Sequence, residues 1–274
     1  MKEVSFQLCN EAENPTTKPD KIANIKADGR RVAIIKEGDK VSLWGRDNIV
    51  DNSFPEIIEA FKRIKGNFVV DSELCVFTNQ FKTDRGLLQI RDRTKDPFKI
   101  RLLTAKYPAT AIVFDLLELN NQNLRNEPYE QRKRLLNDLF KRFPNDTSDK
   151  PSIIKVTKDW QNPMEAWKFV LNNQLEGIVE KDIHSKYSGK RTDDWIKVKR
   201  KGIFKIRFNG YETQNAGITL TNKEGFRCAC NGQKHIPVKE LFNKQGYVDV
   251  WVKALADKTE KGKLREIVFY NYEV

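Results

Sequence analysis

The spacing of apolar residues changes character near Lys201, and this change constrains the fold more than any other feature of the chain. Before it, strand-like runs such as the hairpin at residues 31–44 alternate with segments of helical spacing such as residues 54–66. After it, helical spacing nearly vanishes, and short strands are separated by Gly and Asn. The sequence therefore predicts an α+β domain over residues 1–201. A small β-barrel should follow over residues 202–274, and the OB-fold is the commonest such barrel that meets nucleic acid.

An excess of cationic residues indicates the kind of partner that this chain meets. The formal net charge is +12. A polyanion is the partner that such an excess favours, because each neutralised phosphate releases condensed counterions. A solvated lysine surface that binds nothing specific would account for the same excess.

Simple features also disfavour several classes of protein. The chain has no run of about 18 apolar residues, so no segment is expected to span a membrane. Its start, MKEVSFQLCN, does not have the form of a secretory signal, so a cytoplasmic location is expected. The cysteines lack the paired spacing of a zinc site and are expected to be free thiols: Cys9, Cys75, Cys228 and Cys230.

One short segment, IKADGRRVAI at residues 25–34, brings a lysine, a turn and paired arginines together before an apolar run. A lysine is a poor nucleophile while it is protonated, with an ordinary pKa of about 10.4. Arg30, Arg31, a metal ion or burial could lower the pKa of Lys26 and free its amine to attack the α-phosphate of a nucleotide. Gly29 would let the chain turn closely around that nucleotide. An ordinary exposed lysine in a surface loop would give the same pattern.

Four further segments carry side chains that suit the same chemistry. DSEL places Glu73 at the start of an apolar run, VFDLLEL carries Phe114, and LEGIVEK carries Glu176 in a strand. In DDWIKVK, Lys197 and Lys199 alternate with apolar residues and therefore project from one face of a strand. Singly, each has an ordinary explanation as a core aromatic, a turn cap or a solvated strand face. Together and in this order, they favour a site that handles phosphates.

Six segments of the chain resemble, in order, the nucleotidyltransferase segments of ATP-dependent DNA ligases: IKADGRR, SLWGRDN, VVDSELCVF, AIVFDLLEL, LEGIVEKDIHSKYSGKR and WIKVKRK. The resemblance covers residues 20–201, and the β-rich tail lies where that family has its OB domain. The resemblance implies a nucleotidyltransferase (adenylation) domain of antiparallel sheets with helices, followed by a small OB-fold domain. The run from Glu176 to Lys199 is close to the form found in small bacterial and archaeal DNA ligases.

The resemblance also implies a role for each matching residue of the nucleotide site. Lys26 would be the lysine that becomes adenylylated, with ATP as the donor of AMP. Glu176 would bind a divalent metal, Mg²⁺ or Mn²⁺, and Glu73 would meet the ribose or help to place the metal. The other cofactor-binding residues would be Arg31 at the nucleotide or the nick 5′-phosphate, Phe114 stacked on adenine, and Lys197 and Lys199 at the α-phosphate. Such a set suits phosphoryl transfer, which depends on charge neutralisation and in-line placement.

The resemblance and the basic stretches together indicate how duplex DNA would be held. Arg46, in the WGRDN segment, would hold the 5′-phosphate of the nick. Two cation-rich stretches, residues 82–101 and 186–207, are expected to contact phosphates on both sides of the nick, and sealing should then weaken steeply with salt. The DNA-binding residues predicted in this way are Arg31, Arg46, Arg85, Arg91, Arg93, Lys190 and Arg191.

The predicted protein is a minimal, monomeric DNA ligase acting in repair, replication or recombination. It would seal 3′-hydroxyl/5′-phosphate nicks in duplex DNA through a lysyl-AMP intermediate and a DNA-adenylate. Two alternatives stay open. An RNA ligase or a capping-type guanylyltransferase shares the K-x-D-G segment, and a non-catalytic nucleic-acid-binding protein could keep the same fold.

The chain departs from the family pattern in two segments. Many relatives have a glutamate where this chain has Asn24, and the carboxy-terminal GKLREIVFYNYEV keeps Arg265 but lacks the ending R-x-D-K, which helps to orient pyrophosphate. The sequence therefore leaves open how the enzyme adenylylates itself and whether ATP is its only nucleotide. The separate amino-terminal DNA-binding domain of larger ligases is expected to be missing.

Overall fold

The structure is a computed structural model that describes residues 4–47, 52–141, 152–256 and 263–273. The chain divides into two compact units, Met1–Lys199 and Arg200–Val274. Sheets and separate helices alternate along the first unit, which confirms the predicted α+β class. None of the described helices is both long enough and apolar enough to cross a bilayer.

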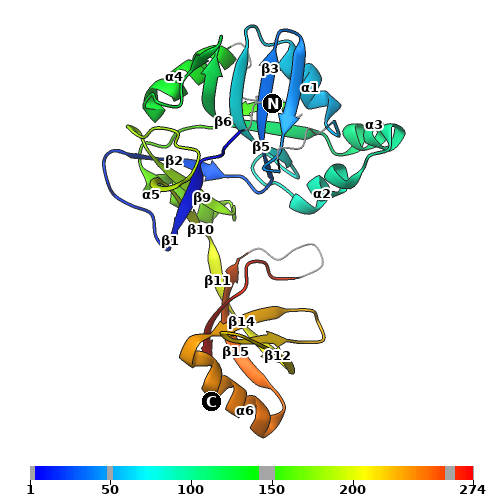
Figure 1. Ribbon diagram of the computed structural model, residues 1–274, viewed down its shortest axis with the longest axis vertical. Coiled ribbons are helices and arrows are strands. Elements are labelled where there is room, and N and C mark those ends of the chain that lie inside the picture. Colours follow the sequence, from blue (N-terminus) through cyan, green and yellow to red (C-terminus); the bar gives the residue numbers. More distant parts are fainter. Residues whose placement is uncertain (1–3, 48–51, 142–151, 257–262, 274) are drawn as a thin grey trace. The chain divides into compact units, whose positions relative to one another are not determined.

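The larger sheet of the first unit carries the main hydrophobic core. Its strands follow the order β4–β3–β5–β6–β7, and β8 pairs with β6 in parallel. These strands are β3 (Arg30–Glu37), β4 (Lys40–Trp44), β5 (Phe68–Val76), β6 (Ala109–Leu119), β7 (Gln122–Asn123) and β8 (Ile154–Val156). Helices α1 (Pro55–Lys62) and α4 (Tyr129–Phe140) pack Phe61 and Phe140 onto one face of this sheet (Figure 1). The hairpin predicted at residues 31–44 and the helix predicted within residues 54–66 are thus confirmed.

The smaller sheet of the first unit packs on the other face of the larger sheet. Its strands, in spatial order, are β1 (Leu8–Ala12), β10 (Arg191–Lys199), β9 (Gly177–Asp182) and β2 (Lys21–Lys26). Val69 of the larger sheet and Trp195 of the smaller one belong to the buried cluster between the two sheets. Helix α5 (Pro163–Asn172) packs Ala166 against the opposite side, where it meets Ile178 and Val198. Residues that alternate with these two along β9 and β10 therefore face the larger sheet.

Two helices of the first unit are not predicted from the sequence. Helix α2 (Arg85–Arg93) begins after Asp84 and helix α3 (Pro97–Lys106) begins after Asp96, and each aspartate caps its helix by accepting a backbone hydrogen bond. None of the residues of α3 is buried. It therefore lacks the buried apolar stripe by which a helix is usually found in a sequence.

The second unit consists of two three-stranded sheets that share one core. The strand orders are β11–β15–β16 and β12–β13–β14. The elements are β11 (Lys201–Phe208), β12 (Gly210–Gln214), β13 (Gly217–Thr221), β14 (Arg227–Asn231), η1 (Gly232–Lys234), α6 (His235–Gln245), β15 (Val248–Leu255) and β16 (Val268–Tyr272). Phe208, Leu220 and Val250 join the two sheets in one buried cluster with α6. The two sheets form no closed barrel among the described residues, so the OB-fold of residues 202–274 stays a prediction.

Candidate active site

The lysine of the K-x-D-G segment lies at the end of a strand, beside a carboxylate. Lys26 is the last residue of β2 and pairs across the ladder with Gly177, the first residue of β9. This register brings the preceding residue, Glu176, to Lys26, and Lys26 Nζ lies 2.7 Å from Glu176 Oε1. The exposed fraction of the Glu176 side chain is 9%, and that of Lys26 is 25%. The ion pair therefore lies in largely dry surroundings, at the edge of the space between the two sheets.

The electrostatics at Lys26 differ from the sequence-based expectation. Burial by itself lowers the pKa of Lys26. The attraction of Glu176, with smaller contributions from Glu73 and Asp28, outweighs burial and raises the pKa above its ordinary value. Lys26 is therefore a paired ammonium ion in this structure.

The neighbouring arginines do not lower the pKa of Lys26 either. Arg30 Nε lies 3.1 Å from a carboxylate oxygen of Asp92, and Arg31 is paired with Asp71. Each positive charge is largely compensated by its own acid. The expectation that these two cations activate the lysine is therefore wrong for this arrangement.

Two carboxylates border the site, and neither is fully compensated. Burial raises the pKa of Glu73 to about 7, although the charges of Lys26 and Arg31 oppose this shift. Burial also raises the pKa of Glu176, against the attraction of Lys26. The buried Oε2 atom of Glu176 has no hydrogen-bond partner among the residues that the structure describes. A carboxylate oxygen without a partner can bind a hard cation, so these two side chains fit the predicted divalent metal.

Protein ligands alone would not complete such a metal site. The described part of the chain contains no group of three or more His, Cys, Asp or Glu side chains arranged around one point. Magnesium is usually bound by one or two carboxylates together with water and substrate phosphates. Glu73 and Glu176 suit that kind of site better than a closed protein cage.

Strand β10 adds two lysines to the sheet face of Lys26. Lys199 lies opposite Gly177 in the β9–β10 ladder, and Lys197 lies two residues earlier on the same strand. Since directly opposite residues share a face of the sheet, both lysines lie on the side of Lys26. Lys197 Nζ also lies 3.2 Å from a carboxylate oxygen of Glu11 on β1. The structure thus brings three predicted phosphate-site lysines together on neighbouring strands.

Phe114 lies on β6 of the larger sheet, in the cluster between the two sheets. Its half-buried ring packs edge-to-face on Trp195, with the ring centroids 6.1 Å apart. This geometry leaves Phe114 suitable as a surface on which a flat base can stack. The structure does not contradict the predicted adenine contact of Phe114, which stays a prediction.

Lys181 supports this aromatic cluster, and sequence reasoning missed it. Its fully buried ammonium donates a hydrogen bond to the Phe114 carbonyl over 3.1 Å. The Lys181 Nζ atom also lies 4.2 to 4.9 Å from the ring centroids of Trp195, Tyr129 and Phe114. Burial lowers the pKa of Lys181 to about 7. The available signal was a lysine inside a short apolar strand, because lysine is almost never fully buried without a specific partner.

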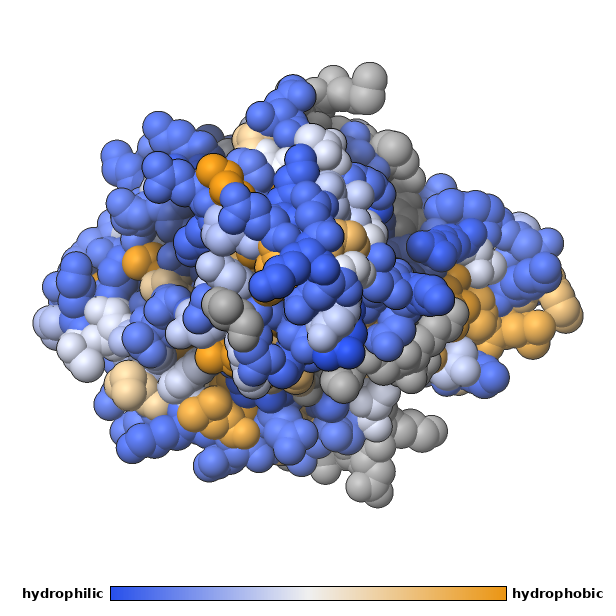
Figure 2. Space-filling model, turned by 90° about the horizontal axis from the view of Figure 1, so that it is seen from below, coloured by the Kyte–Doolittle hydropathy of each residue, from blue (hydrophilic) through white to orange (hydrophobic). Residues whose placement is uncertain are grey.

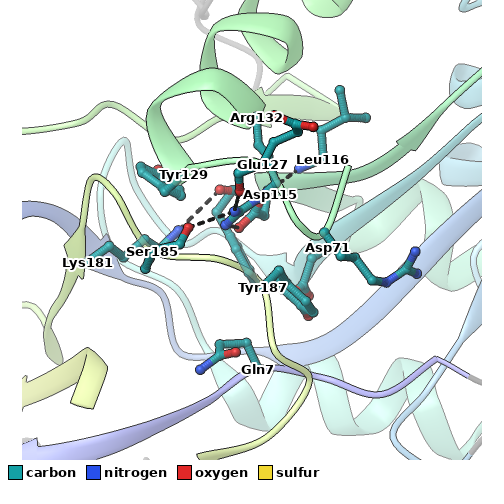
Figure 3. Close-up of polar contacts among 12 residues, drawn as sticks. Gln7, Asp71, Asp115, Leu116, Glu127, Tyr129, Arg132, Lys181, Ser185 and Tyr187 are labelled. Atoms are coloured by element: carbon teal, nitrogen blue, oxygen red, sulfur yellow. Dashed lines mark hydrogen bonds and ion pairs between the residues drawn. The ribbon is translucent and has the colours of Figure 1, made fainter. Parts of the chain in front are cut away.

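Two buried arginine–carboxylate pairs brace the strands behind the site, and sequence reasoning missed these as well. Arg132 of α4 binds Asp115 of β6 through two contacts of 2.8 and 2.9 Å. Figure 3 draws these two residues in contact. Arg31 of β3 binds Asp71 of β5 through contacts of 2.9 and 2.5 Å, and Asp71 also accepts a hydrogen bond from the hydroxyl of Tyr187. The sequence signal was an acid within each of the apolar segments VVDSEL and VFDLLEL, since a buried carboxylate requires a cationic partner.

Gly29 of the K-x-D-G segment is required by close packing on β5. A Cβ atom at this position would meet the Leu74 carbonyl oxygen at 2.1 Å and the Cys75 sulfur at 2.6 Å. Arg85 of α2 donates a hydrogen bond to the Gly29 carbonyl from the other side. The glycine therefore holds the segment after Lys26 directly against the strand that carries Glu73.

The arginines predicted to contact DNA fall into two groups. Five predicted DNA-binding residues are exposed: Arg46, Arg85, Arg93, Lys190 and Arg191. Arg91 is only 1% exposed, lies 2.8 Å from a carboxylate oxygen of Glu56 and donates hydrogen bonds to the carbonyls of Ser53 and Tyr107. The prediction that Arg91 contacts DNA does not fit this structure, because its guanidinium is enclosed by protein. Arg31, at 8% exposure and paired with an acid, offers a phosphate little surface.

Known proteins resemble this chain over much of its length. The family model described as ATP dependent DNA ligase domain matches residues 3–199. A DNA ligase of Sulfophobococcus zilligii is 32% identical over 188 residues, which cover 64% of this chain and 29% of that protein. The bifunctional non-homologous end joining protein LigD of Bacillus subtilis (strain 168) is 27% identical over 208 residues, which cover 72% of this chain and 34% of that protein. This chain therefore spans about a third of the length of these two relatives.

A solved structure agrees with these relatives in its fold. A structure from a study of Lig E DNA ligases matches with a TM-score of 0.71 at 16% identity, covering 98% of this chain and 99% of that one. At 16% identity the match shows that the two chains share a fold, and it does not assign roles to individual side chains.

Proposed function

Because this chain belongs to the ATP-dependent DNA ligase family, we propose that it seals nicks in duplex DNA, joining a 3′-hydroxyl to a 5′-phosphate with consumption of ATP. The observation that carries this proposal is the ion pair of Lys26 with Glu176, with Lys199 on the same sheet face. The amine, a partly unsatisfied carboxylate and a second cation thus lie within one small region. A phosphoramide-forming site needs these three groups.

The first step would transfer AMP to Lys26. The Nζ atom attacks the α-phosphorus of ATP, a P–N bond forms, and the bond to pyrophosphate breaks as pyrophosphate leaves. The amine must lose a proton before it attacks, and the Glu176 pair holds it in the protonated form. The arriving nucleotide must therefore break this pair, while Lys197 and Lys199 neutralise charge on the α-phosphate.

The next two steps would use the same site for DNA. The 5′-phosphate of the nick attacks the phosphorus of lysyl-AMP, so the P–N bond breaks and a DNA-adenylate forms. The 3′-hydroxyl then attacks the 5′-phosphate, and AMP leaves. Arg46 supports this assignment because it is exposed and lies close enough to Glu73 to influence the pKa of that carboxyl. A divalent cation held by Glu73 and Glu176 would neutralise phosphate charge in these transfers.

The proposal extends to the substrate, the metal, the location and the oligomeric state. We propose nicked duplex DNA as the substrate, Mg²⁺ or Mn²⁺ as the metal, a cytoplasmic location and a monomer, since one enzyme can surround one nick. The five exposed cations named above support the first assignment, because exposed cationic side chains can reach phosphates.

Mass spectrometry after mixing with ATP and Mg²⁺ tests the proposal directly. The protein should gain the mass of one AMP, and peptide mapping should place it on Lys26. Lys26→Ala should gain nothing, whereas Lys18→Ala, which changes an exposed lysine before β2, should be labelled like the wild type. An adduct at another lysine, or none, would contradict the assignment.

The same preparation separates the alternatives. The wild type should take AMP from ATP in preference to GMP from GTP, and the charged enzyme should seal nicked DNA better than nicked RNA. Preference for GTP would indicate a guanylyltransferase, and preference for nicked RNA an RNA ligase. DNA binding that Lys26→Ala leaves unchanged, with no adduct in the wild type, would indicate a pure binding protein.

A further inference from the structure

One face of the β11–β15–β16 sheet exposes large apolar side chains in an ordered array. The exposed fractions are 51% for Ile203, 36% for Trp251, 53% for Val268 and 47% for Tyr270. Alternate residues of the same strands, such as Val250, are buried in the core of the second unit. Hydrophobic side chains also reach the surface in separate groups on the side shown in Figure 2, the widest of them at its right-hand edge. A sheet face that gathers two aromatic and two aliphatic side chains is a candidate binding surface, because such grouping marks one.

The register places cations between these apolar residues. Lys253 lies opposite Ile203 on one side and opposite Val268 on the other, and Lys205 lies opposite Trp251. Apolar and basic side chains therefore alternate along β11 and β15, and each of these pairs sets a lysine opposite an apolar residue. The face thus differs from a typical apolar docking patch, whose centre is depleted of charge.

The cations of this face lie against its aromatic rings. Lys253 Nζ is 4.9 Å from the ring centroid of Tyr270, and Lys205 Nζ is 5.9 Å from that of Trp251. Lys205 also forms ion pairs with Asp249 and Glu273 at the margin of the face. Each ring thus has an ammonium group beside it, so a planar ligand on the ring would have a positive charge within reach of any attached anion.

We propose that this face, defined by Ile203, Lys205, Trp251, Lys253, Val268 and Tyr270, binds single-stranded DNA by stacking unpaired bases on its aromatic rings. An unpaired base offers a free π-face to Trp251 or Tyr270, and its phosphate can reach the neighbouring lysine. Bases within a duplex are stacked on each other, so the rings could bind them only after unstacking them. This face belongs to the second unit, whereas the proposed nick-sealing site at Lys26 belongs to the first.

Fluorescence anisotropy with a labelled oligo(dT) of about 12 nucleotides, the full chain and no ATP tests this proposal. Base–aromatic stacking predicts that Trp251→Ala weakens binding by roughly fivefold to 150-fold. Trp251→Phe keeps a flat ring and should bind within about threefold of the wild type. Ile236→Ala removes an apolar side chain that is 52% exposed from α6 of the same unit, and it should leave the affinity unchanged.

Tryptophan emission gives a second readout on the same samples. Trp251 is the only tryptophan of residues 200–274. Oligo(dT) should therefore quench part of the emission of the wild type, and Trp251→Phe should lose this quenching while it still binds. Circular dichroism of each variant reports whether the fold is kept. Equal affinity of Trp251→Ala and Ile236→Ala for oligo(dT) would overturn the proposal. An equal loss of affinity for a blunt duplex would also overturn it, and would assign the face to duplex DNA.

Discussion

Replacing Asp71 with leucine should destabilise the first unit by about 3–5 kcal/mol, because the guanidinium of Arg31 would stay buried without its counter-ion. Asp71 is fully buried and Arg31 is 8% exposed. Their two contacts of 2.9 and 2.5 Å leave little room for water to replace the lost carboxylate. Arg31→Met alone should cost a similar amount, since it leaves the carboxylate uncompensated.

The double variant Arg31→Met, Asp71→Leu separates the ion pair from its surroundings. It removes both charges and fills a similar volume, so the cost should be limited to the groups that lose a partner. These are the carbonyl of Gln7, which Arg31 contacts at 2.5 Å, and the hydroxyl of Tyr187, which Asp71 contacts at 2.6 Å. Each such group costs about 1–3 kcal/mol, so the double variant should lose about 2–6 kcal/mol. The two single losses add to about 6–10 kcal/mol, so the single variants together should lose more than the double variant.

Urea unfolding at neutral pH, followed by near-ultraviolet circular dichroism, measures these differences. Single variants within about 1 kcal/mol of the wild type would refute the reasoning, and so would a double variant that loses the sum of the two single losses. AMP labelling of Lys26 gives an independent readout. A double variant that is stable but takes no AMP would support the predicted contact of Arg31 with the nucleotide.

Three further predictions concern single residues. Burial lowers the pKa of Lys181 to about 7, so between about pH 7 and pH 10 the unfolded chain binds more protons than the folded one, and folding stability gains from rising pH. Lys181→Met lacks this gain, so the free energy of unfolding of the variant, measured with urea, should fall relative to that of the wild type as the pH rises through that range. A difference between the two proteins that does not change with pH would contradict the burial argument. Glu176 raises the pKa of Lys26, so Glu176→Gln should increase the rate at which acetic anhydride acetylates Lys26 at neutral pH, measured against Lys18 as the internal reference. Gly29→Ala should abolish AMP labelling, because its Cβ would meet the Leu74 carbonyl at 2.1 Å, whereas Gly86→Ala, whose Cβ meets only the Asp84 side chain at 3.0 Å, should be labelled normally.

The order of short segments was enough to predict which residues gather at the site. Lys26, Glu176 and Lys199 are far apart in the chain, yet each lies at the end of a strand or beside one in the smaller sheet. The pattern of alternation along DDWIKVK predicted that Lys197 and Lys199 share a face, and the ladder register agrees. Such predictions succeed because the spacing within a strand is fixed by its geometry.

The sequence could not predict which distant acidic residues pair with its buried arginines. Arg31 was grouped with Lys26 as a nearby cation, but its partner Asp71 comes from another strand, and the pKa of Lys26 is raised rather than lowered. Arg91 was grouped with a basic surface stretch, but on α2 it falls on the buried side with Leu88 and reaches Glu56 on α1. A run of cations therefore predicts a basic surface only where the helical face is known. That face could not be read from α2 and α3, whose residues are largely exposed.

The buried interior and the edge of this site differ in how completely their charged groups are paired. In the interior, Asp71 and Asp115 each bind an arginine through two contacts, so these pairs fix the strands and have little left to offer a ligand. At the edge, Glu73 has a pKa near 7 and Glu176 keeps one buried oxygen without a hydrogen bond from the described residues. A buried polar group without a partner costs free energy of folding, and a protein that folds despite this cost commonly uses the group for a ligand. The paired residues of the interior can thus fix the strands that carry Glu73 and Glu176, so that these carboxylates are available to a nucleotide and its metal. Filling the interior with apolar residues should therefore alter stability first, whereas changing the edge carboxylates should alter AMP transfer first.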